Sequence, residues 1–338
     1  MKNITNISES AKLTALSLGL SLGRNSEDAS GVQGGSMGIR VNGSVIESSP
    51  NEKSLAAAKE LLDNPDFQPV SPRFAATVML VRDSKPGQTK YRIEDGEYPP
   101  DFPTGQELEV FMLRRVKTMD FVPDAVVFPG GRVDEKDSEC GLKWAGPTPA
   151  QWANYMNVDE ETARKVVVAA AREVFEECGV LLAGFENGDL VTDLSDPSWA
   201  EDRRALEAHE LALSEMLMRR DLVLRTDLLG LISNFCTPEF EHKRYDTFFF
   251  SALMPEGQVA DDKTSEAQIA GWVTPAYALR EGDANRWLVL APTVYNLTCI
   301  ANAHDAETFV SARRTLKKIM SKPYYREDGS IGLRGELS

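Results

Sequence analysis

The feature that most constrains this chain is a short segment in which three glutamates follow a helical spacing. Residues 172–180 read REVFEECGV. On an α-helix Glu173, Glu176 and Glu177 stand at positions i, i+3 and i+4, so their carboxylates face the same way. A separate stripe at helical spacing is apolar, and it comprises Val167, Val168, Ala171, Val174, Phe175 and Cys178. The segment predicts an amphipathic helix with an acidic row away from the apolar stripe.

The ends of this helix are also marked in the sequence. The helix is expected to run from Val158 to Cys178, with Asn157 or Asp159 as its N-cap. Gly179 suits the left-handed position that follows a helix, because glycine adopts that conformation without steric cost.

Three carboxylates at close range repel one another, and this repulsion destabilises the empty helix. A Mg²⁺ or Mn²⁺ ion would relieve it, because these cations take carboxylate oxygens as ligands. Arg172 can pair with Glu176 at i+4 and hold that carboxylate in place. The alternative is a solvated acidic helix face, which charge alone favours. The flanking residues decide between the two interpretations.

With these flanks the segment resembles the Nudix box, written G-x5-E-x7-R-E-U-x-E-E-x-G-U with U a bulky aliphatic residue. Every fixed position of its second half, from Arg172 to Val180, is filled. The first half is at Gly131 to Asp137, after a Phe-Pro-Gly-Gly run, with Asp137 where the family has Glu. Asp137 and Arg172 lie 35 positions apart, where the motif separates them by eight. The box is therefore split by an insertion, which we assign to residues 138–158.

A split box of this kind is similar to one branch of the superfamily, the peroxisomal coenzyme A diphosphatases and their bacterial relatives. Further matching motifs lie at residues 121–131, 237–249, 272–275 and 292–293, and the resemblance covers about residues 72 to 300. It implies metal-dependent hydrolysis of a diphosphate bond, with coenzyme A or acyl-coenzyme A giving 3′,5′-ADP and (acyl-)phosphopantetheine. ADP-ribose, NADH or another nucleoside-diphosphate derivative would use the same metal site and remains an alternative.

The resemblance also implies roles for single residues of the box. The ligands of Mg²⁺ or Mn²⁺ would be Glu173, Glu176 and Glu177. Arg172 would orient Glu176 or a neighbouring carboxylate. Gly131 would lie beside the metal, and Gly130 would permit a tight approach of the backbone.

Candidates outside the box are less firmly tied to the motif. Glu266 is the candidate general base, and Glu177 is the alternative; the blander interpretation of Glu266 is an ordinary loop acid. Arg114 and Arg115 are candidates for binding substrate phosphates, or are surface charges at the end of a strand. Trp144, Trp152 and Tyr155 of the insertion could stack on a base as a lid, but packing of the insertion onto the core is favoured.

A function of another class is a ligand-sensing Nudix module without turnover. Such members of the superfamily usually carry damaged boxes. The survival of all three helix glutamates argues for activity instead.

The expected fold is an α/β/α sandwich with a mixed sheet, an insertion within the Nudix box and a C-terminal helical extension. Residues 1–70 are expected to be a disordered tail with a short helix at residues 54–62. Residues 71–290 are assigned to the Nudix domain, and residues 291–338 to a helical extension packed on it with loose last residues. Strands are expected at residues 74–82, 109–115, 231–235, 245–252 and 269–273, and a further helix at residues 201–219.

The overall charge limits the partners of the chain. Its formal net charge is −15 and its isoelectric point is about 4.8, so it repels nucleic-acid backbones. A small anionic substrate stays compatible with this charge, because a bound divalent metal reverses the local field. No apolar run approaches the roughly 20 residues of a membrane helix, and the four cysteines form no CxxC pair. We expect a cytoplasmic enzyme with a small-molecule diphosphate substrate, no nucleic-acid or membrane partner, and a homodimer as an option that the family suggests.

Overall fold

The computed structural model describes residues 38–42, 44–84, 108–117, 122–138, 141–264 and 267–337. Most of the segment between the strands expected at residues 74–82 and 109–115 lies outside these ranges. So do Glu266 and the first 37 residues of the predicted tail.

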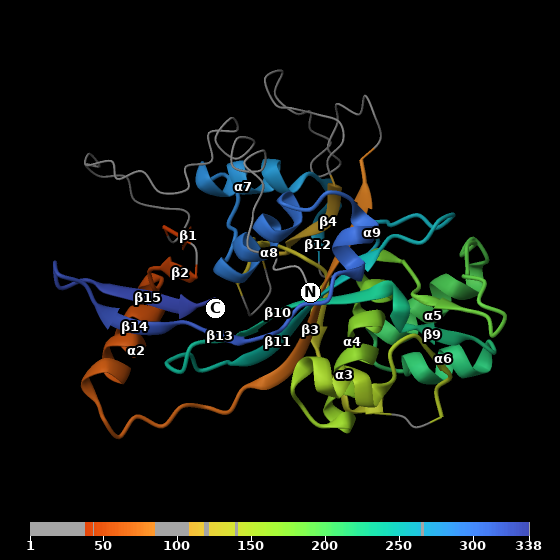
Figure 1. The fold of residues 1–338 in the computed structure, drawn as a ribbon, viewed down its shortest axis with the longest axis horizontal. Coiled ribbons are helices and arrows are strands. Elements are labelled where there is room, and N and C mark those ends of the chain that lie inside the picture. Colours follow the sequence, from red (N-terminus) through yellow and green to blue (C-terminus); the bar gives the residue numbers. More distant parts are fainter. Residues whose placement is uncertain are drawn as a thin grey trace, which may run out of the picture.

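A mixed sheet lies at the centre of the protein, with the strand order β12-β4-β3-β11-β10-β13 (Figure 1). Strand β3 runs parallel to β11 and antiparallel to β4, while β10 runs antiparallel to β11 and parallel to β13. All five predicted strands are confirmed. The strands of the whole sheet are β3 (Arg73–Asp83), β4 (Leu108–Arg115), β10 (Leu229–Cys236), β11 (Tyr245–Leu253), β12 (Ala267–Val273) and β13 (Lys318–Met320), with β5 (Val126–Val127) beside β4 and β6 (Gly130–Arg132) beside β3.

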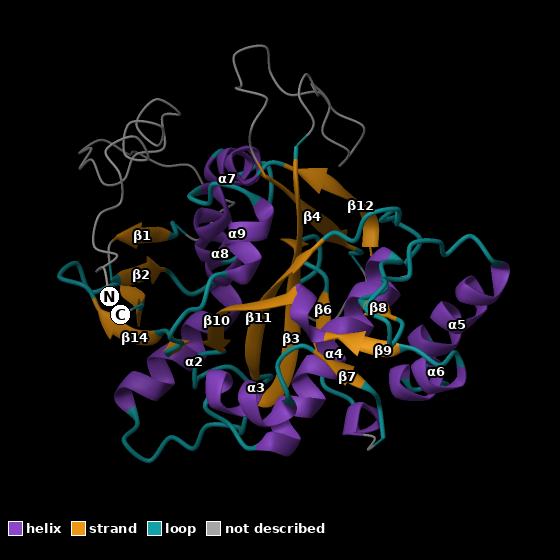
Figure 2. Cartoon of the chain, turned by 45° about the vertical axis from the view of Figure 1, so that its right-hand side comes forward, coloured by secondary structure: helices purple, strands orange, loops and turns teal. Residues whose placement is uncertain are grey.

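Helices cover both faces of this sheet. Alternate side chains of each strand point to opposite faces, so each face has its own layer of core residues. Val78 and Leu80 of β3 pack in one core cluster with helices α3 (Pro149–Met156) and α4 (Glu160–Cys178). Met79 and Val81 pack in a second cluster with α7 (Pro275–Asp283), α8 (Ala291–Ala301) and α9 (Ala306–Ser311). The two helical layers are visible on opposite sides of the sheet in Figures 1 and 2. The predicted α/β/α sandwich is confirmed.

Helix α4 forms where the sequence predicts it, with its first residue two positions later. The side chain of Asp159 accepts a hydrogen bond from the amide of Thr162 at 2.8 Å, which satisfies one of the free donors of the first turn. The helix ends at Gly179, whose φ of 68° lies in the left-handed region. Of the two N-cap candidates, the structure selects Asp159.

The insertion into the box is anchored at two places. Strand β7 (Trp144–Ala145) pairs with β9 (Val223–Arg225), which also pairs with β8 (Ala183–Gly184) in a small separate sheet. Helix α3 begins with a capping box at Thr148. Its Trp152 is fully buried and contacts Tyr155 and Phe250 edge-on. The alternative in which Trp152 stacks on a substrate is therefore wrong, and the packing interpretation is confirmed.

One predicted helix proves to be two. In place of a helix over residues 201–219, the structure has α5 (Pro197–Glu207) and α6 (Leu213–Arg219), separated at His209 by a positive φ of 55°. Buried Asp202 of α5 accepts hydrogen bonds from Arg220 at 2.6 and 2.8 Å and from Arg219, both at the end of α6. This ion-pair cluster folds α6 back onto α5.

The ends of the described chain form a second sheet, which the sequence analysis missed. Its strand order is β1-β2-β15-β14, so segments from opposite ends of the chain pair directly. Helix α2 (Glu52–Asp63), predicted at residues 54–62, packs Ala58 against Ile331 and Leu333 of this sheet. The sheet consists of β1 (Arg40–Asn42), β2 (Val45–Ser48), β14 (Lys322–Tyr325) and β15 (Ile331–Glu336).

These strands correct two expectations. Residues 40–42 and 45–48 form strands and not a disordered tail, and residues 291–337 contain three strands besides two helices, so the extension is not purely helical with a loose end. The short strands of both segments carry little local signal, and they are stabilised by pairing across the fold rather than by their own sequence.

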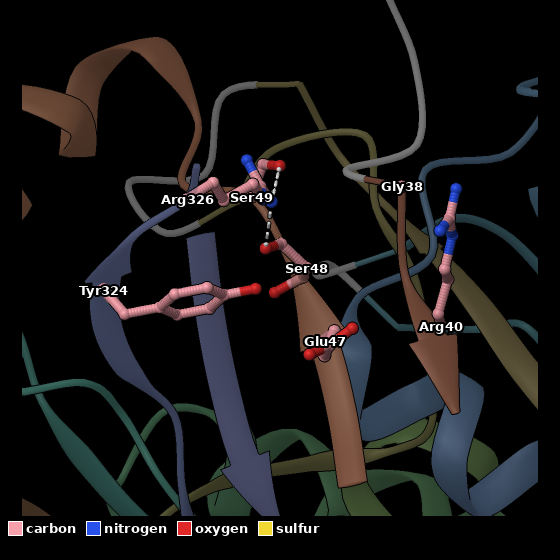
Figure 3. A pocket seen from close by; sticks show the side chains of 7 residues that line it. All are labelled: Gly38, Arg40, Glu47, Ser48, Ser49, Tyr324 and Arg326. Carbon is pink, nitrogen blue, oxygen red and sulfur yellow. Dashed lines mark hydrogen bonds between the residues drawn. The ribbon is translucent and has the colours of Figure 1, made fainter. Parts of the chain in front are cut away.

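A hollow of about 230 Å³ lies on this second sheet (Figure 3). Among its lining residues, Arg326 donates hydrogen bonds to the carbonyl of Ser48 at 3.1 Å and to Ser49 Oγ at 2.9 Å. None of the lining residues belongs to α4, so this hollow is not the site of the helix glutamates. Within the described ranges, no helix is both long and apolar enough to cross a membrane.

The packing of the insertion generates a stability prediction. Trp152→Ala should lower the free energy of unfolding by about 3–5 kcal/mol, because it removes a fully buried aromatic side chain from a close-packed core. Urea unfolding followed by circular dichroism measures this change. Phe185→Ala is the matched control; its ring is 47% exposed, and its loss should stay within about 0.5 kcal/mol. An equally small loss for Trp152→Ala would contradict the packing described here.

Candidate functional site

The site is built where β6 passes between β3 and the last half of α4. In β6, Gly130 and Gly131 pair with Thr77 and Ala76 of β3. A Cβ atom on Gly130 would lie 2.5 Å from the carbonyl oxygen of Ala76, and one on Gly131 would collide with the carboxylate of Glu173. Gly130 needs glycine because a side chain there would push β6 away from the backbone of β3, whereas a side chain at Gly131 would displace the carboxylate of Glu173. This is the tight backbone approach that the sequence analysis expects of Gly130.

Arg172 is the centre of the site and is almost fully buried. Its Nε and Nη2 lie 3.0 and 3.2 Å from the two carboxylate oxygens of Asp137. Its Nη1 lies 2.8 Å from Glu173 Oε1 and 3.1 Å from Glu176 Oε2, so the predicted ion pair with Glu176 is present. Nη2 also donates to the carbonyl oxygen of Arg132 at 2.9 Å. One guanidinium thus joins both halves of the split box.

Asp137 reaches this guanidinium in spite of the insertion that follows it. It lies in a 3₁₀ helix, Glu135–Ser138, and its Oδ2 also accepts a hydrogen bond from the amide of Asp134 at 2.7 Å. The shorter carboxylate, at the position where the family has Glu, still engages two nitrogens of Arg172. The substitution and the split therefore leave this bidentate pair intact.

The remaining glutamate is held from the other side. The backbone amide of Gly130 donates to Glu177 Oε2 at 2.9 Å, which links the end of α4 to β6. Glu176 differs from its neighbours, because its Oε1 is buried and has no hydrogen-bond partner in the described part of the chain. A buried carboxylate oxygen without a partner is costly. It is therefore the atom of the site that most needs a ligand.

The electrostatics of the cluster point the same way. Burial raises the pKa of Glu176 to about 7, although the charge of Arg172 opposes the shift. Burial also raises the pKa of Asp137, again against the effect of Arg172. For Arg172 itself, burial would lower the pKa, but the charges of Glu173 and Asp137 raise it. The single buried guanidinium of Arg172 pairs with three carboxylates, so the site retains an excess of negative charge.

These residues fit a hard divalent cation, because they offer carboxylate oxygens and an excess negative charge. Within the described ranges, no three acidic, histidine or cysteine side chains already converge on one metal position. Arg172 holds Glu173 and Glu176, and the amide of Gly130 holds Glu177. These contacts restrain the three carboxylates, and Glu176 keeps its Oε1 without a hydrogen-bond partner in the described part of the chain.

The other candidates lie outside this cluster. Arg114, at the end of β4, makes an ion pair with Asp124 at 3.1 Å. Arg115 is half-buried, its Nε lacks a hydrogen-bond partner among the described residues, and it lies opposite Ala267 of β12. Glu266, the residue before Ala267, is outside the described residues. Sequence reasoning also missed a buried arginine of α5, Arg203, which donates to the carbonyl oxygen of Glu176 at 2.8 Å.

The central guanidinium generates a second stability prediction. Arg172→Met, measured by urea unfolding without added metal, should lower the free energy of unfolding by about 3–5 kcal/mol. The physical reason is that buried carboxylates lose the cation that compensates them. Arg164→Met on the same helix is the control, because Arg164 reaches Glu160 only at 4.0 Å and should cost less than about 1 kcal/mol. Equal losses in the two variants would show that Arg172 does not organise the cluster.

No family model matches the chain. Nudix hydrolase 7 of Caenorhabditis elegans is 28% identical over 214 residues, which are 63% of this chain and 63% of that protein, so the chain spans less than two thirds of this relative. Acyl-coenzyme A diphosphatase NUDT19 of Xenopus laevis is 23% identical over 257 residues, 66% of this chain and 68% of that protein.

A solved structure of a Nudix hydrolase is also similar to this chain. The crystal structure of a NUDIX hydrolase from Alicyclobacillus acidocaldarius superposes with a TM-score of 0.57 at 25% identity, over 73% of this chain and 98% of that one. The likeness extends over nearly the whole of the bacterial protein. The chain is thus similar to Nudix hydrolases in sequence and in fold, and the two halves of its split box meet at one guanidinium.

Proposed function

We propose that this protein hydrolyses a diphosphate bond in a small nucleoside-diphosphate-linked molecule, with Mg²⁺ or Mn²⁺ as its cofactor. The observation that carries the proposal is the buried acidic cluster around Arg172, in which Glu176 Oε1 has no partner among the described residues. A stably folded core does not need such an atom, whereas a metal site does.

In this proposal the three helix glutamates hold the metal. The bound metal would neutralise charge that develops on the phosphate oxygens and would lower the pKa of a water molecule. Arg172 orients Glu173 and Glu176 through its Nη1, and Asp137 in turn fixes the guanidinium. The amide of Gly130 holds Glu177. In the reaction, an oxygen of water bonds to one phosphorus, the bridging P–O bond breaks, and both products end in phosphate.

The leading substrate is coenzyme A or an acyl-coenzyme A, cleaved to 3′,5′-ADP and (acyl-)phosphopantetheine. Two observations support it. The split box resembles that of the coenzyme A diphosphatase branch, and the Xenopus laevis relative is named as an acyl-coenzyme A diphosphatase. The alternative substrates are ADP-ribose, NADH and other nucleoside-diphosphate derivatives, which present the same diphosphate to the metal.

The general base remains a choice between Glu177 and Glu266. Glu177 is within the cluster, but the amide of Gly130 occupies one of its oxygens. Glu266 lies outside the described residues, so it remains a candidate from the sequence alone. Arg114 and Arg115 remain the proposed contacts for substrate phosphates.

A non-catalytic ligand-sensing module is the proposal of another class. The complete set of helix glutamates argues against it. A cytoplasmic location and a homodimer also remain proposals; Cys178, Cys236 and Cys299 are free thiols, which fits a reducing compartment.

Incubation with a substrate panel tests the function directly. The purified protein with Mg²⁺ or Mn²⁺ is expected to release 3′,5′-ADP from coenzyme A or acyl-coenzyme A, with products identified by mass spectrometry. Cleavage of ADP-ribose, NADH or a dinucleoside polyphosphate instead would keep the chemistry and replace the substrate. Metal binding without cleavage of any member of the panel would favour the sensing module.

Substitution of the helix glutamates tests the metal assignment. The double variant Glu176→Gln, Glu177→Gln should lower kcat by at least about 100-fold, since removal of electrostatic stabilisation of a transition state costs that much. The matched control is Glu160→Gln, Glu161→Gln in the first turn of the same helix, where both side chains are exposed. Its kcat should stay near that of the wild type. Retention of full activity by the first double variant would refute the assignment.

A further inference from the structure

The last turn of α4, which carries Glu176 and Glu177, is held by the amide of Gly179 and by two groups from outside the Nudix box. The terminal carbonyl oxygens of a helix lack partners within the helix. Here the amide of Gly179 donates to the carbonyl oxygen of Phe175 at 3.0 Å. The carbonyl oxygen of Glu176 accepts from Arg203 Nε at 2.8 Å. That of Cys178 accepts from the amide of Asp261 at 2.9 Å.

Arg203 makes the cationic contact in this set. It comes from α5, is only 8% exposed, and lies where a positive charge stabilises the negative end of the helix dipole. A Cβ atom on Gly179 would lie 2.8 Å from Arg203 Nη1. The glycine of the box thus has a second purpose besides its left-handed φ, because it leaves room for this guanidinium.

Arg203 also reaches the segment that leads to β12. Its Nη1 donates to Asp261 Oδ1 at 2.7 Å, and the same oxygen accepts a hydrogen bond from the amide of Lys263 at 3.0 Å. Asp261 therefore closes a local turn and at the same time anchors it to α5. One side chain joins the metal-facing end of α4, helix α5 and the approach to β12.

We propose that Arg203 is a positioning residue of the hydrolase: it fixes the last turn of α4, and with it the aim of Glu176 and Glu177 toward the metal. The inference rests on the proposed function. Its physical basis is that the guanidinium is planar and rigid, so bonds to Glu176 and Asp261 together fix its orientation. Partners that orient the ligands of a metal affect its affinity and the reaction rate, although they touch neither metal nor substrate.

The test replaces Arg203 by Met and reads out metal binding separately from turnover. The first readout is the Mg²⁺ concentration at which half of the metal-induced rise in melting temperature is reached. The second is kcat and KM for the substrate found in the panel. We expect Arg203→Met to raise the Mg²⁺ midpoint and lower kcat, each by about 10–100-fold, with KM changed much less.

Arg203→Lys keeps the test valid where the Met variant does not fold. A lysine ammonium can reach one acceptor but lacks the fork that binds the carbonyl of Glu176 and Asp261 together. It should restore part of the loss, with a smaller change of the Mg²⁺ midpoint and of kcat in the same direction. Wild-type values for both would overturn the positioning role.

Arg220→Met is the matched control. Arg220, at the end of α6, donates to buried Asp202 of α5 at 2.6 and 2.8 Å, and it also donates to Ser198 of α5 at 2.9 Å. Its loss should lower the melting temperature and leave the Mg²⁺ midpoint and kcat unchanged. The same pattern for Arg203→Met, lower stability with unaltered metal response and turnover, would reduce Arg203 to a structural cap and overturn the inference.

The two proposals fail in different ways. A wild-type protein that responds to Mg²⁺ but cleaves no member of the panel refutes the proposed function, and the Mg²⁺ midpoint of the variants still decides on Arg203. A wild-type protein that responds to neither Mg²⁺ nor Mn²⁺ overturns both.

Discussion

The ion-pair cluster around Arg172 is the constraint on which the rest of the structure depends. Its single buried guanidinium pairs with three carboxylates, two from the same helix and one from the segment before the insertion. The charges are unequal, so the cluster is incompletely compensated. A buried, undercompensated set of acids is unfavourable in a purely structural role. In the proposed function a divalent cation would complete the cluster, so the same excess charge that is unfavourable in the folded core would serve metal binding.

The surrounding layers can be understood as support for this cluster. The two glycines of β6 let a strand and a helix approach closely enough for the amide of Gly130 to reach Glu177. The insertion does not disturb this arrangement, because β7 and α3 fasten it to the small sheet and to the core. A polar site held on rigid elements keeps its geometry better than one held on loops. The insertion thus adds structure beside the site without loosening it.

Local patterns predicted the parts of the fold whose causes are local. The start and end of α4 could be read from Asp159 and Gly179, since a cap is decided within a few residues. The break between α5 and α6 could not be predicted, because no glycine or proline marks His209. The break depends on the hydrogen bonds that Asp202 accepts from Arg219 and Arg220, farther along the chain.

In the candidate site, too, residues marked by a local pattern or a motif could be predicted, whereas contacts across the fold could not. The helix glutamates and Arg172 stand out by spacing, and a matching motif brought Asp137 to attention. The contact of Asp137 with Arg172 across 35 positions required the structure. Arg203 gave no signal at all, since a lone arginine on a helix resembles any exposed basic residue until its burial is known.

The second sheet has a consequence for how the protein is made. Strand β2 lies beside β15, and residues near position 46 pair with residues near position 335. During synthesis, the early strand must wait for almost the whole chain to leave the ribosome before its partner exists. Contacts between such distant residues carry a large loop-closure cost and form late. The central sandwich, assembled from β3 onward, can therefore form while this sheet is still open.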